Sequence, residues 1–272
     1  MGIFCDCPKR LRAYRDSYWD RNDRNRDASL VSFAIWMKAA LTSKSPTVTI
    51  GDYIAVASAW SDFEVTARSI FNAYGLGYLH GVEFQNRKPP FNTWSPIKQR
   101  TFVTELFDVV RRTVEFGVTF SVRKDAYLQA KQVHGRNRNE SAYGFAFRGA
   151  LEHILHDEVV RLAISDYQAR LSFVVESGCA NQDDLRRIFE IHKAHPSLTS
   201  FMGGLDFADK KSTIALQIAD FLAYQSRRYV AACEERGGYA PMPDVFAIMT
   251  DRIPYRDAVA TGFHPTRPAD AA

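Results

Sequence analysis

The chain has 272 residues, of which 46% are hydrophobic and 24% charged, a balance typical of a globular protein with a substantial core. No run of about 18 apolar residues occurs, which excludes an ordinary transmembrane helix. The four cysteines form no CxxC pair, which argues against a zinc site and for a reducing, cytoplasmic compartment. The formal net charge of +4 permits nucleic-acid binding but does not require it.

The N-terminal half begins with a segment that lacks a folding pattern. Residues 1–30 are polar and rich in Arg, Asp and Asn, so we expect a poorly ordered extension there. The apolar residues 29–41 predict a strand or a short helix, and the β-branched residues 46–60 predict a strand or a hairpin. A helix is expected over 61–75, followed by a short strand or turn over 76–84.

The C-terminal half predicts alternating helices and strands. Ser95 followed by Pro96 indicates the start of a helix. The next predicted elements are a strand over 116–124, a helix over about 141–165, a strand over 169–178, a helix over 182–195, a weak strand over 198–209 and a helix over 215–228. Because the alternation shows no repeat, we predict one α/β domain with a mixed sheet. The absence of GxGxxG and P-loop motifs disfavours nucleotide-binding folds.

Two carboxylates are candidates for chemistry. Glu176 directly follows the apolar run LSFVV, and the carboxyl end of a strand is where open α/β sheets bind ligands. From the sequence alone, however, a turn residue before Ser177-Gly178 is the favoured interpretation. Asp220 shares a narrow helical arc with Gln217, Tyr224 and Arg227. By pattern alone this arc is best read as the solvated edge of a buried helix; the alternative is that it faces a cleft.

Other motifs carry weaker signals. His80 and Glu83, in YLHGVEF, are able to bind a metal or line a groove, but such a histidine more often packs and hydrogen-bonds. His153 is followed by Ile154 where the HExxH motif needs Glu, so a zinc-protease site is excluded and a solvated helix face is expected. No GxSxG motif is present, so serine hydrolysis has no specific support.

Several segments, taken in order, resemble one known family. They are YIAVASAWSDFE, GLGYLHGVEF, PPFNTWSPIKQRTFVTELFDVVRR, FGVTFSVRKDAY, AYGFAFRGALE, LSFVVESG and ALQIADFLAYQSRR. They resemble the bacterial and phage family called domain of unknown function 3800 over roughly residues 45–232, most clearly in LQIADFLA against the family's LQxADxxA helix. The resemblance implies a single-domain α/β fold of the RNase H-like type, a mixed sheet flanked by helices, related to metal-dependent nucleases. The expected organisation is an extension over 1–30, an RNase H-like domain over 31–235 and a tail over 236–272.

The resemblance also implies a site and a cofactor. Its expected members are the metal ligands and catalytic carboxylates Glu176 and Asp220, the auxiliary catalytic residues His80 and Glu83, and the substrate-binding residues Gln217 and Arg227. Gln217 is expected either to contact the substrate phosphate or to orient Asp220. The implied cofactor is Mg²⁺ or Mn²⁺, since two such ions about 3.5–4 Å apart stabilise the attacking and leaving oxygens of a phosphodiester. Without metal, carboxylates held together repel one another.

One part of the family pattern is missing. The Asp-Glu-Ser-Gly-like motif of the first strand has no counterpart, because WMKAALTSKSPTVTIGDY places Lys38, Ala39 or Ala40 where the acidic residue belongs. Asp52, on the following strand, is a poor substitute. Either the protein is a degenerate member that keeps the fold, or the sequence upstream of about residue 45 is altered by a frameshift or a misassigned start.

The leading hypothesis is a divergent metal-dependent nuclease that hydrolyses phosphodiester bonds in DNA or RNA. The alternative is a catalytically inactive RNase H-like fold that binds nucleic acid or a protein partner, and a weaker third possibility is a hydrolase of unrelated substrates. No membrane partner is expected, and the sequence does not predict an oligomeric state.

Overall fold

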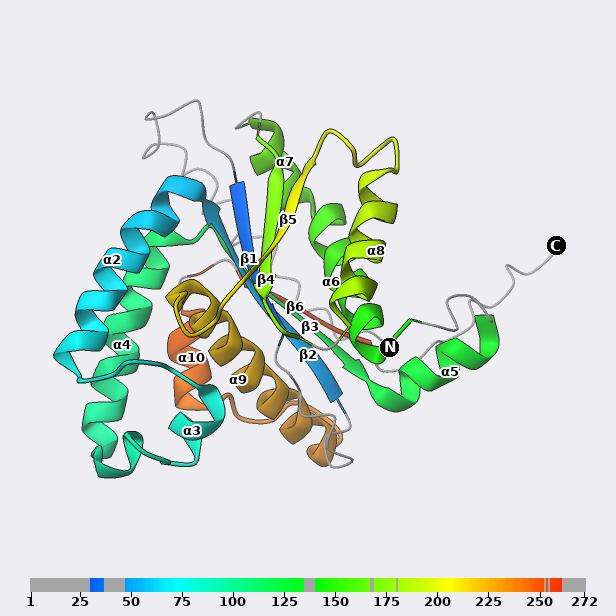
Figure 1. The fold of residues 1–272 in the computed structure, drawn as a ribbon. Helices are drawn as coiled ribbons and strands as arrows, with labels where there is room; N and C mark the ends of the chain where they lie inside the picture. Colours follow the sequence, from blue (N-terminus) through cyan, green and yellow to red (C-terminus); the bar gives the residue numbers. More distant parts are fainter. Residues whose placement is uncertain are drawn as a thin grey trace.

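The computed structural model describes residues 30–36, 47–134, 140–166, 169–179, 181–251, 253 and 255–260, which form a six-stranded mixed sheet between two layers of helices (Figure 1). The strands are β1 (Leu30–Trp36), β2 (Thr47–Val56), β3 (Phe116–Arg123), β4 (Leu171–Glu176), β5 (Met202–Ala208) and β6 (Tyr255–Ala260). The helices are α2 (Ala57–Ala73), α3 (Gly81–Gln85), the short 3-10 helix η2 (Phe91–Thr93), α4 (Pro96–Thr113), α5 (Lys124–His134), α6 (Ala142–His156), α7 (Glu158–Asp166), α8 (Gln182–Lys193), α9 (Ile214–Arg236) and α10 (Asp244–Thr250).

The strands lie in the order β5-β4-β1-β2-β3-β6. β1, β2 and β3 are antiparallel neighbours, whereas β4 runs parallel to β1, β5 parallel to β4, and β6 parallel to β3. Alternate residues of β2 enter different cores: Ile50 and Ile54 face one side, and Tyr53 and Ala55 face the other. Both faces of the sheet are therefore buried, as the long apolar strands require.

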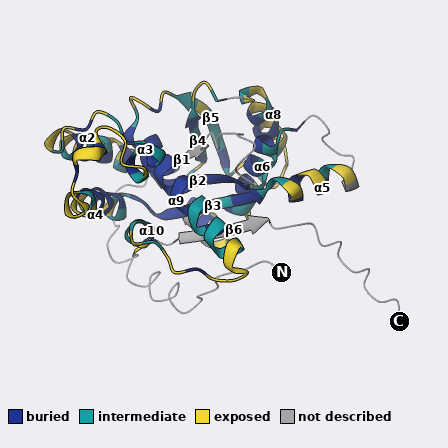
Figure 2. Ribbon diagram, turned by 90° about the horizontal axis from the view of Figure 1, so that it is seen from below, coloured by how far each residue is buried: buried dark blue, intermediate teal, exposed yellow. Residues whose placement is uncertain are grey.

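Each face of the sheet has its own hydrophobic core. Helices α2, α4, α9 and α10 supply one core, and α6, α7 and α8 supply the other. In Figure 2 the strands β2 and β3 and the first half of α9 are mostly dark blue, and exposed residues lie on the outer faces of helices such as α2 and α5. The described helices include none that is both long and apolar enough to cross a membrane.

Helix α9 packs backbone against backbone on the sheet. A Cβ atom at Gly51 in β2 would lie 2.6 Å from the amide nitrogen of Ala223 and 2.7 Å from the carbonyl oxygen of Ala219. Those distances are far below van der Waals contact, so only glycine fits there. The position of α9 over the centre of the sheet is thereby fixed.

Several predicted elements are present, and local chemistry explains them. Helix α4 begins where Ser95 and Pro96 predict, and the Ser95 hydroxyl oxygen accepts a hydrogen bond from the Lys98 amide at 3.1 Å. The long helix expected over 141–165 is wrong, because it is two helices. Asp157 has an extended backbone, and its Oδ1 accepts from the Val160 amide at 3.1 Å, which caps the start of α7.

Three local predictions differ from the structure. The strand or turn expected over 76–84 is instead a loop followed by the short helix α3, which packs on α9 where a Cβ at Gly81 would lie 3.0 Å from the Tyr224 side chain. Helix α5 had no counterpart among the predicted elements. The packing also continues past residue 235, since α10 enters the first core and β6 extends the sheet beside β3. The expected extension over 1–30 lies almost wholly outside the described residues.

Candidate functional site

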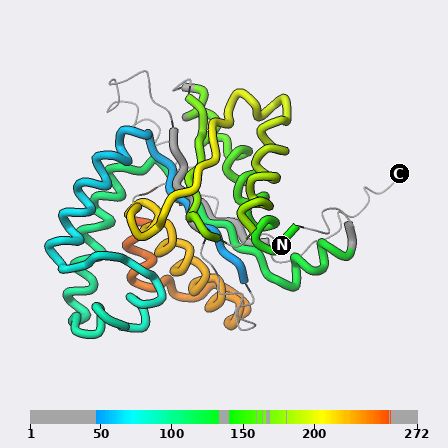
Figure 3. Tube along the Cα trace, viewed as in Figure 1, coloured from blue at the N-terminus to red at the C-terminus, as the bar shows by residue number. Residues whose placement is uncertain are grey.

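The carboxyl ends of β4 and β5 bring the candidate residues together. Glu176 is the last residue of β4 and pairs in register with Ala208, the last residue of β5. The Ser177 amide donates a hydrogen bond to the Ala208 carbonyl at 2.7 Å, which holds the two strand ends together. The chain then turns from β5 into α9, as the yellow-to-gold trace in Figure 3 shows. Lys210 lies in this connecting segment.

Asp220 forms a buried ion pair with Lys210. The Lys210 Nζ atom lies 2.9 Å from Asp220 Oδ1, and the two side chains are 7% and 3% exposed. No described residue donates a hydrogen bond to Asp220 Oδ2, which is also buried. The solvated-edge interpretation of Asp220 is therefore wrong, and its side chain faces the loop between β5 and α9.

The arc that carries Asp220 is covered by the segment between α2 and α3. Leu79 donates its amide hydrogen to Gln217 Oε1 at 2.8 Å, the Lys210 ammonium lies 5.8 Å from the centre of the Tyr78 ring, and Gly81 packs on Tyr224. This cover explains why a polar helix arc is buried. The hydrophobic pattern could not reveal it, because the covering residues lie far away in the sequence.

Gln217 ties two loops to α9. Its Nε2 donates to the carbonyl oxygens of Lys210 at 2.9 Å and Lys211 at 3.2 Å, while its Oε1 accepts from Leu79. Gln217 is fully buried. The two bonds from Nε2 use both of its amide hydrogens, and the third bond is accepted by its oxygen. Of the two roles expected for it, contact with substrate and orientation of Asp220, the hydrogen bonds favour orientation, exerted through the backbone of Lys210.

Helix α2 also holds the Lys210 loop. Glu64 Oε1 accepts a hydrogen bond from the Ala215 amide at 2.7 Å, which satisfies a free donor in the first turn of α9. Arg68 donates to the Ser212 carbonyl at 2.9 Å. The backbone from Lys210 to Ala215 is thus held by side chains from two helices, α2 and α9.

The charges in the site keep Lys210 a cation. Burial alone lowers the pKa of Lys210, but Asp220, Tyr78 and Glu176 raise it by more, so the net shift is upward. Burial raises the pKa of the Tyr78 phenol, and the nearby Lys210 opposes that shift while Asp220 and Glu176 add to it. Glu176 and Asp220, from different elements, therefore act on the same ammonium group and the same phenol.

The other predicted residues surround this centre at different depths. The half-buried Arg227 guanidinium lies 5.5 Å from the centre of the Tyr224 ring; burial lowers its pKa, and Tyr224 and Asp220 oppose the shift. His80 stacks on Tyr78 with ring centres 6.1 Å apart, and its Nδ1 lies 3.8 Å from Glu83 Oε1. His80 and Glu83 thus form a partly exposed pair, which contacts Tyr78 at the edge of this centre.

Tyr143 of α6 approaches the same carboxylates from the other side of the sheet. Burial raises the pKa of its phenol well above the usual value, and Cys179, Glu176 and Asp220 add to that shift. Sequence reasoning missed Tyr143, Tyr78 and Lys210 as neighbours of the carboxylates. None has a motif, since each is brought to the site by the packing of separate elements.

The first strand carries no carboxylate at the level of the site. The paired residues of β1 and β4 end with Phe33 beside Val174, so two residues further along both strands Ile35 is level with Glu176. The expected positions Lys38, Ala39 and Ala40 lie outside the described residues. The position level with Glu176 is isoleucine, which offers no metal ligand.

Asp52 does not replace that missing carboxylate. It lies opposite Ala34 of β1 and Val118 of β3 and is 1% exposed. Its neighbours in β2, Tyr53 and Gly51, face α9, so Asp52 points to the opposite face of the sheet. The prediction that it is a poor substitute agrees with this placement.

The donor set fits one oxygen-ligated cation and does not fit two. Within the part of the chain that the structure describes, no group of three His, Cys, Asp or Glu side chains is placed to hold a metal. Two carboxylates remain, and the buried, unpartnered Oδ2 of Asp220 is an oxygen able to bind a cation. Mg²⁺ in enzymes is often held by only one or two carboxylates, with water and substrate phosphate completing its shell.

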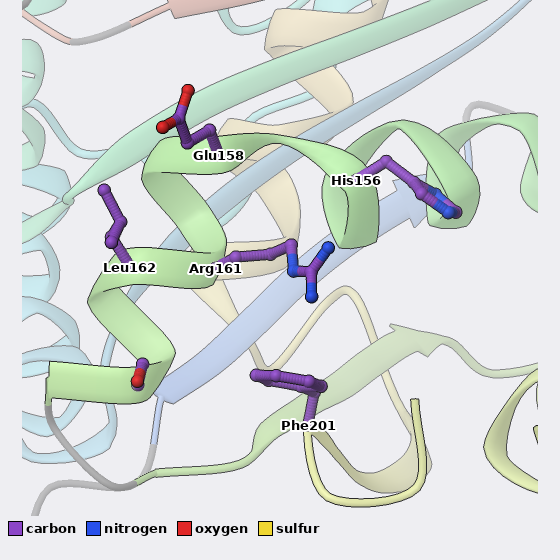
Figure 4. A pocket seen from close by; sticks show the side chains of 6 residues that line it. His156, Glu158, Arg161, Leu162 and Phe201 are labelled. Carbon is purple, nitrogen blue, oxygen red and sulfur yellow. The ribbon is translucent and has the colours of Figure 1, made fainter. Parts of the chain in front are cut away.

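A separate hollow lies at the opposite end of the same strands. It has a volume of about 330 Å³ and is lined by His156, Glu158, Arg161, Leu162, Ser165 and Phe201. Figure 4 shows Arg161 reaching over Phe201, whose ring centre lies 5.4 Å from the guanidinium carbon. Because Phe201 precedes β5 whereas Lys210 follows it, this hollow is distinct from the acidic pair.

No family model matches the chain, and no curated protein or solved structure does either. The function is therefore inferred from the chain's own residues and geometry.

Proposed function

We propose that the chain has an RNase H-like fold. The strand order supports this proposal: β1, β2 and β3 form an antiparallel meander, and β4 and β5 add beside β1 in parallel, giving the order β5-β4-β1-β2-β3. That order and those directions are the ones expected of an RNase H-like sheet, and they support the proposal. β6 is an additional edge strand beside β3.

We propose further that the protein is a divergent metal-dependent nuclease with a reduced acidic site. The observation that carries this proposal is the buried ion pair of Asp220 with Lys210 at 2.9 Å, with Asp220 Oδ2 buried and unpartnered among the described residues. Glu176, at the end of β4, adds a second carboxylate, which contributes to the raised pKa of Lys210. These two carboxylates would hold one Mg²⁺ or Mn²⁺. When bound, such an ion supplies Lewis-acid stabilisation of phosphoryl oxygens.

The surroundings of the pair suit a nucleic-acid substrate. Arg227 is a half-buried cation over the Tyr224 ring, suited to a phosphate group. Tyr78 and His80 form a partly exposed stacked pair, and the bases of single-stranded nucleic acids stack on aromatic rings. We expect Arg227 to bind a phosphate group, and the stacked pair of His80 and Tyr78 to stack with a base.

Calorimetric titration with Mn²⁺ tests this proposal. The wild-type chain should bind saturably, and Asp220→Asn and Glu176→Gln should each lose the binding. Glu190→Gln, which removes an exposed carboxylate on α8, is the control and should bind like wild type. Cleavage of single- and double-stranded DNA and RNA should then follow the same ranking, and wild type without binding or cleavage would refute the proposal.

A second candidate is a catalytically inactive RNase H-like protein that binds nucleic acid. Ile35 at the level of Glu176 favours it, because a two-ion site lacks its third carboxylate. This candidate predicts that single-stranded DNA or RNA binds with a salt-dependent affinity that Arg227→Ala weakens and Glu176→Gln leaves intact. Cleavage by wild type that is lost in Glu176→Gln would decide for the nuclease.

A further inference from the structure

Lys210 already supplies a positive charge to the acidic pair. Its ammonium lies 2.9 Å from Asp220 Oδ1 and 5.8 Å from the centre of the Tyr78 ring, and Glu176 also raises its pKa. The side chain is 7% exposed, so water contributes little to its solvation. Two carboxylates and one ammonium leave one net negative charge in a buried place, which is a strong attraction for a further cation.

The ammonium and a metal ion cannot both lie against the Asp220 carboxylate. A divalent ion bound to Asp220 would lie within a few ångströms of Lys210 Nζ, where the repulsion between like charges is large at low dielectric. A metal ion therefore gains access only if the ammonium leaves Asp220 or is absent.

The backbone of Lys210 cannot move easily to allow this. Its carbonyl oxygen is bound by Gln217 Nε2 at 2.9 Å, and the following loop is held at Ser212 by Arg68. The lysine stem, by contrast, has four rotatable bonds and carries a compact charge. Displacement would thus occur by rotation of the side chain, with the loop unchanged.

We propose that Lys210 is a built-in competitor for the divalent cation: its ammonium neutralises Asp220 and Glu176 when no metal is bound, and metal binds where the ammonium withdraws. This inference rests on the proposed cation site at the same pair. It assigns Lys210 a role in setting metal affinity, separate from any role in catalysis. In both states a cation, either the ammonium or the metal ion, lies beside the carboxylates, so the fold is retained.

Metal affinity of Lys210 variants tests the inference. Lys210→Met keeps the length of the side chain and removes the charge, and Mn²⁺ titrated by calorimetry should bind it about tenfold more tightly than wild type, or better. Lys211→Met is the matched control, because Lys211 is exposed on the same loop, and its affinity should equal that of wild type. The double variant Lys210→Met/Asp220→Asn should lose binding, which places the metal at Asp220.

Since Lys210→Met leaves Asp220 buried without its partner, folding is measured as well. Thermal unfolding with and without Mn²⁺ should show that the metal restores the stability lost in Lys210→Met. A variant that remains unfolded in millimolar Mn²⁺ counts against the inference, because the metal would then not replace the ammonium.

A measurement on the unaltered chain gives independent evidence. Lysine acylation followed by peptide mass spectrometry should show slow reaction at Lys210 and fast reaction at Lys211, and saturating Mn²⁺ should accelerate Lys210 alone several-fold. Metal binding by wild type with unchanged Lys210 reactivity overturns the inference and leaves the nuclease proposal standing. Binding by Lys210→Met but not by wild type supports the inference and refutes the nuclease proposal. Binding by neither refutes both.

Discussion

The ion pair between Lys210 and Asp220 provides the sharpest test of the structure. Asp220→Asn keeps the shape of the side chain and removes its charge, so the Lys210 ammonium stays buried without its closest counter-ion. Breaking a buried pair by neutralising one partner typically costs about 3–5 kcal/mol. Glu176 and Tyr78 still act on the ammonium, and the asparagine oxygen still accepts a hydrogen bond, so we expect a loss near the lower limit, about 3 kcal/mol.

The assay is urea unfolding followed by circular dichroism, in buffer without divalent ions. At about 2–4 °C per kcal/mol for a chain of this size, the melting temperature should also fall by roughly 6–12 °C. The double variant Lys210→Met/Asp220→Asn removes both charges and should recover a large part of the loss, since replacing a whole buried pair by uncharged groups is often tolerated. Glu190→Gln, at an exposed site, should stay within about 0.5 kcal/mol of wild type.

Two outcomes would refute this reasoning. One is an Asp220→Asn chain within about 1 kcal/mol of wild type, which would mean that the pair is solvated or absent. The other is a double variant whose loss equals the sum of the two single losses, because residues in direct contact should couple. Either result would also remove the basis for a competition between Lys210 and a metal ion.

Three further predictions concern the surroundings. Gly51→Ala should cost about 3 kcal/mol, since the added Cβ meets the backbone of α9 at 2.6 Å, whereas Gly77→Ala, with open space around its Cβ, should be nearly neutral; equal urea midpoints would contradict this. Gln217→Leu should cost about 3 kcal/mol by leaving three backbone groups unpaired, and a wild-type unfolding curve would show that those bonds contribute nothing. Glu152 Oε1 lies 3.6 Å from His192 Nε2, and this contact raises the pKa of His192 and lowers the pKa of Glu152. The pair therefore stabilises the fold below the unfolded pKa of histidine, about 6.5, and loses that contribution as the pH rises through the raised folded-state value. Glu152→Gln should destabilise more at pH 6 than at pH 8 and lower the pKa of His192 measured by NMR, and an equal effect at both pH values would count against the pair.

Local chemistry allowed much of the fold to be predicted. The Ser95-Pro96 start of α4 and the alternating pattern of β3 depend only on neighbouring residues, and both elements lie where the sequence places them. Elements that depend on distant partners were missed. α3 is five residues long and is held by its packing on α9, and β6 exists because β3 offers it an open edge.

Some residues of the site could likewise be predicted from the sequence, and others could not. Glu176 and Asp220 could be selected from the sequence because a strand end and a helix pattern mark them. Lys210 could not, since nothing in its neighbourhood distinguishes it from Lys211, yet one is buried against Asp220 and the other exposed. The difference arises from the hydrogen bonds of Gln217, which fix the direction of the loop and therefore decide which lysine points inward.

The close approach of α9 to β2 has a consequence for transplanting this segment into another protein. In LQIADFLA, Ala219 and Ala223 flank the contact with Gly51, Gln217 holds two loops, and Asp220 meets Lys210. Each of these residues contacts a partner in another segment of the chain. Grafted alone onto a new sheet, the helix would lose its close packing on the strand glycine, and its carboxylate would be buried without a counter-ion. A working graft would have to carry the strand glycine and the preceding loop lysine with it, as one inseparable part.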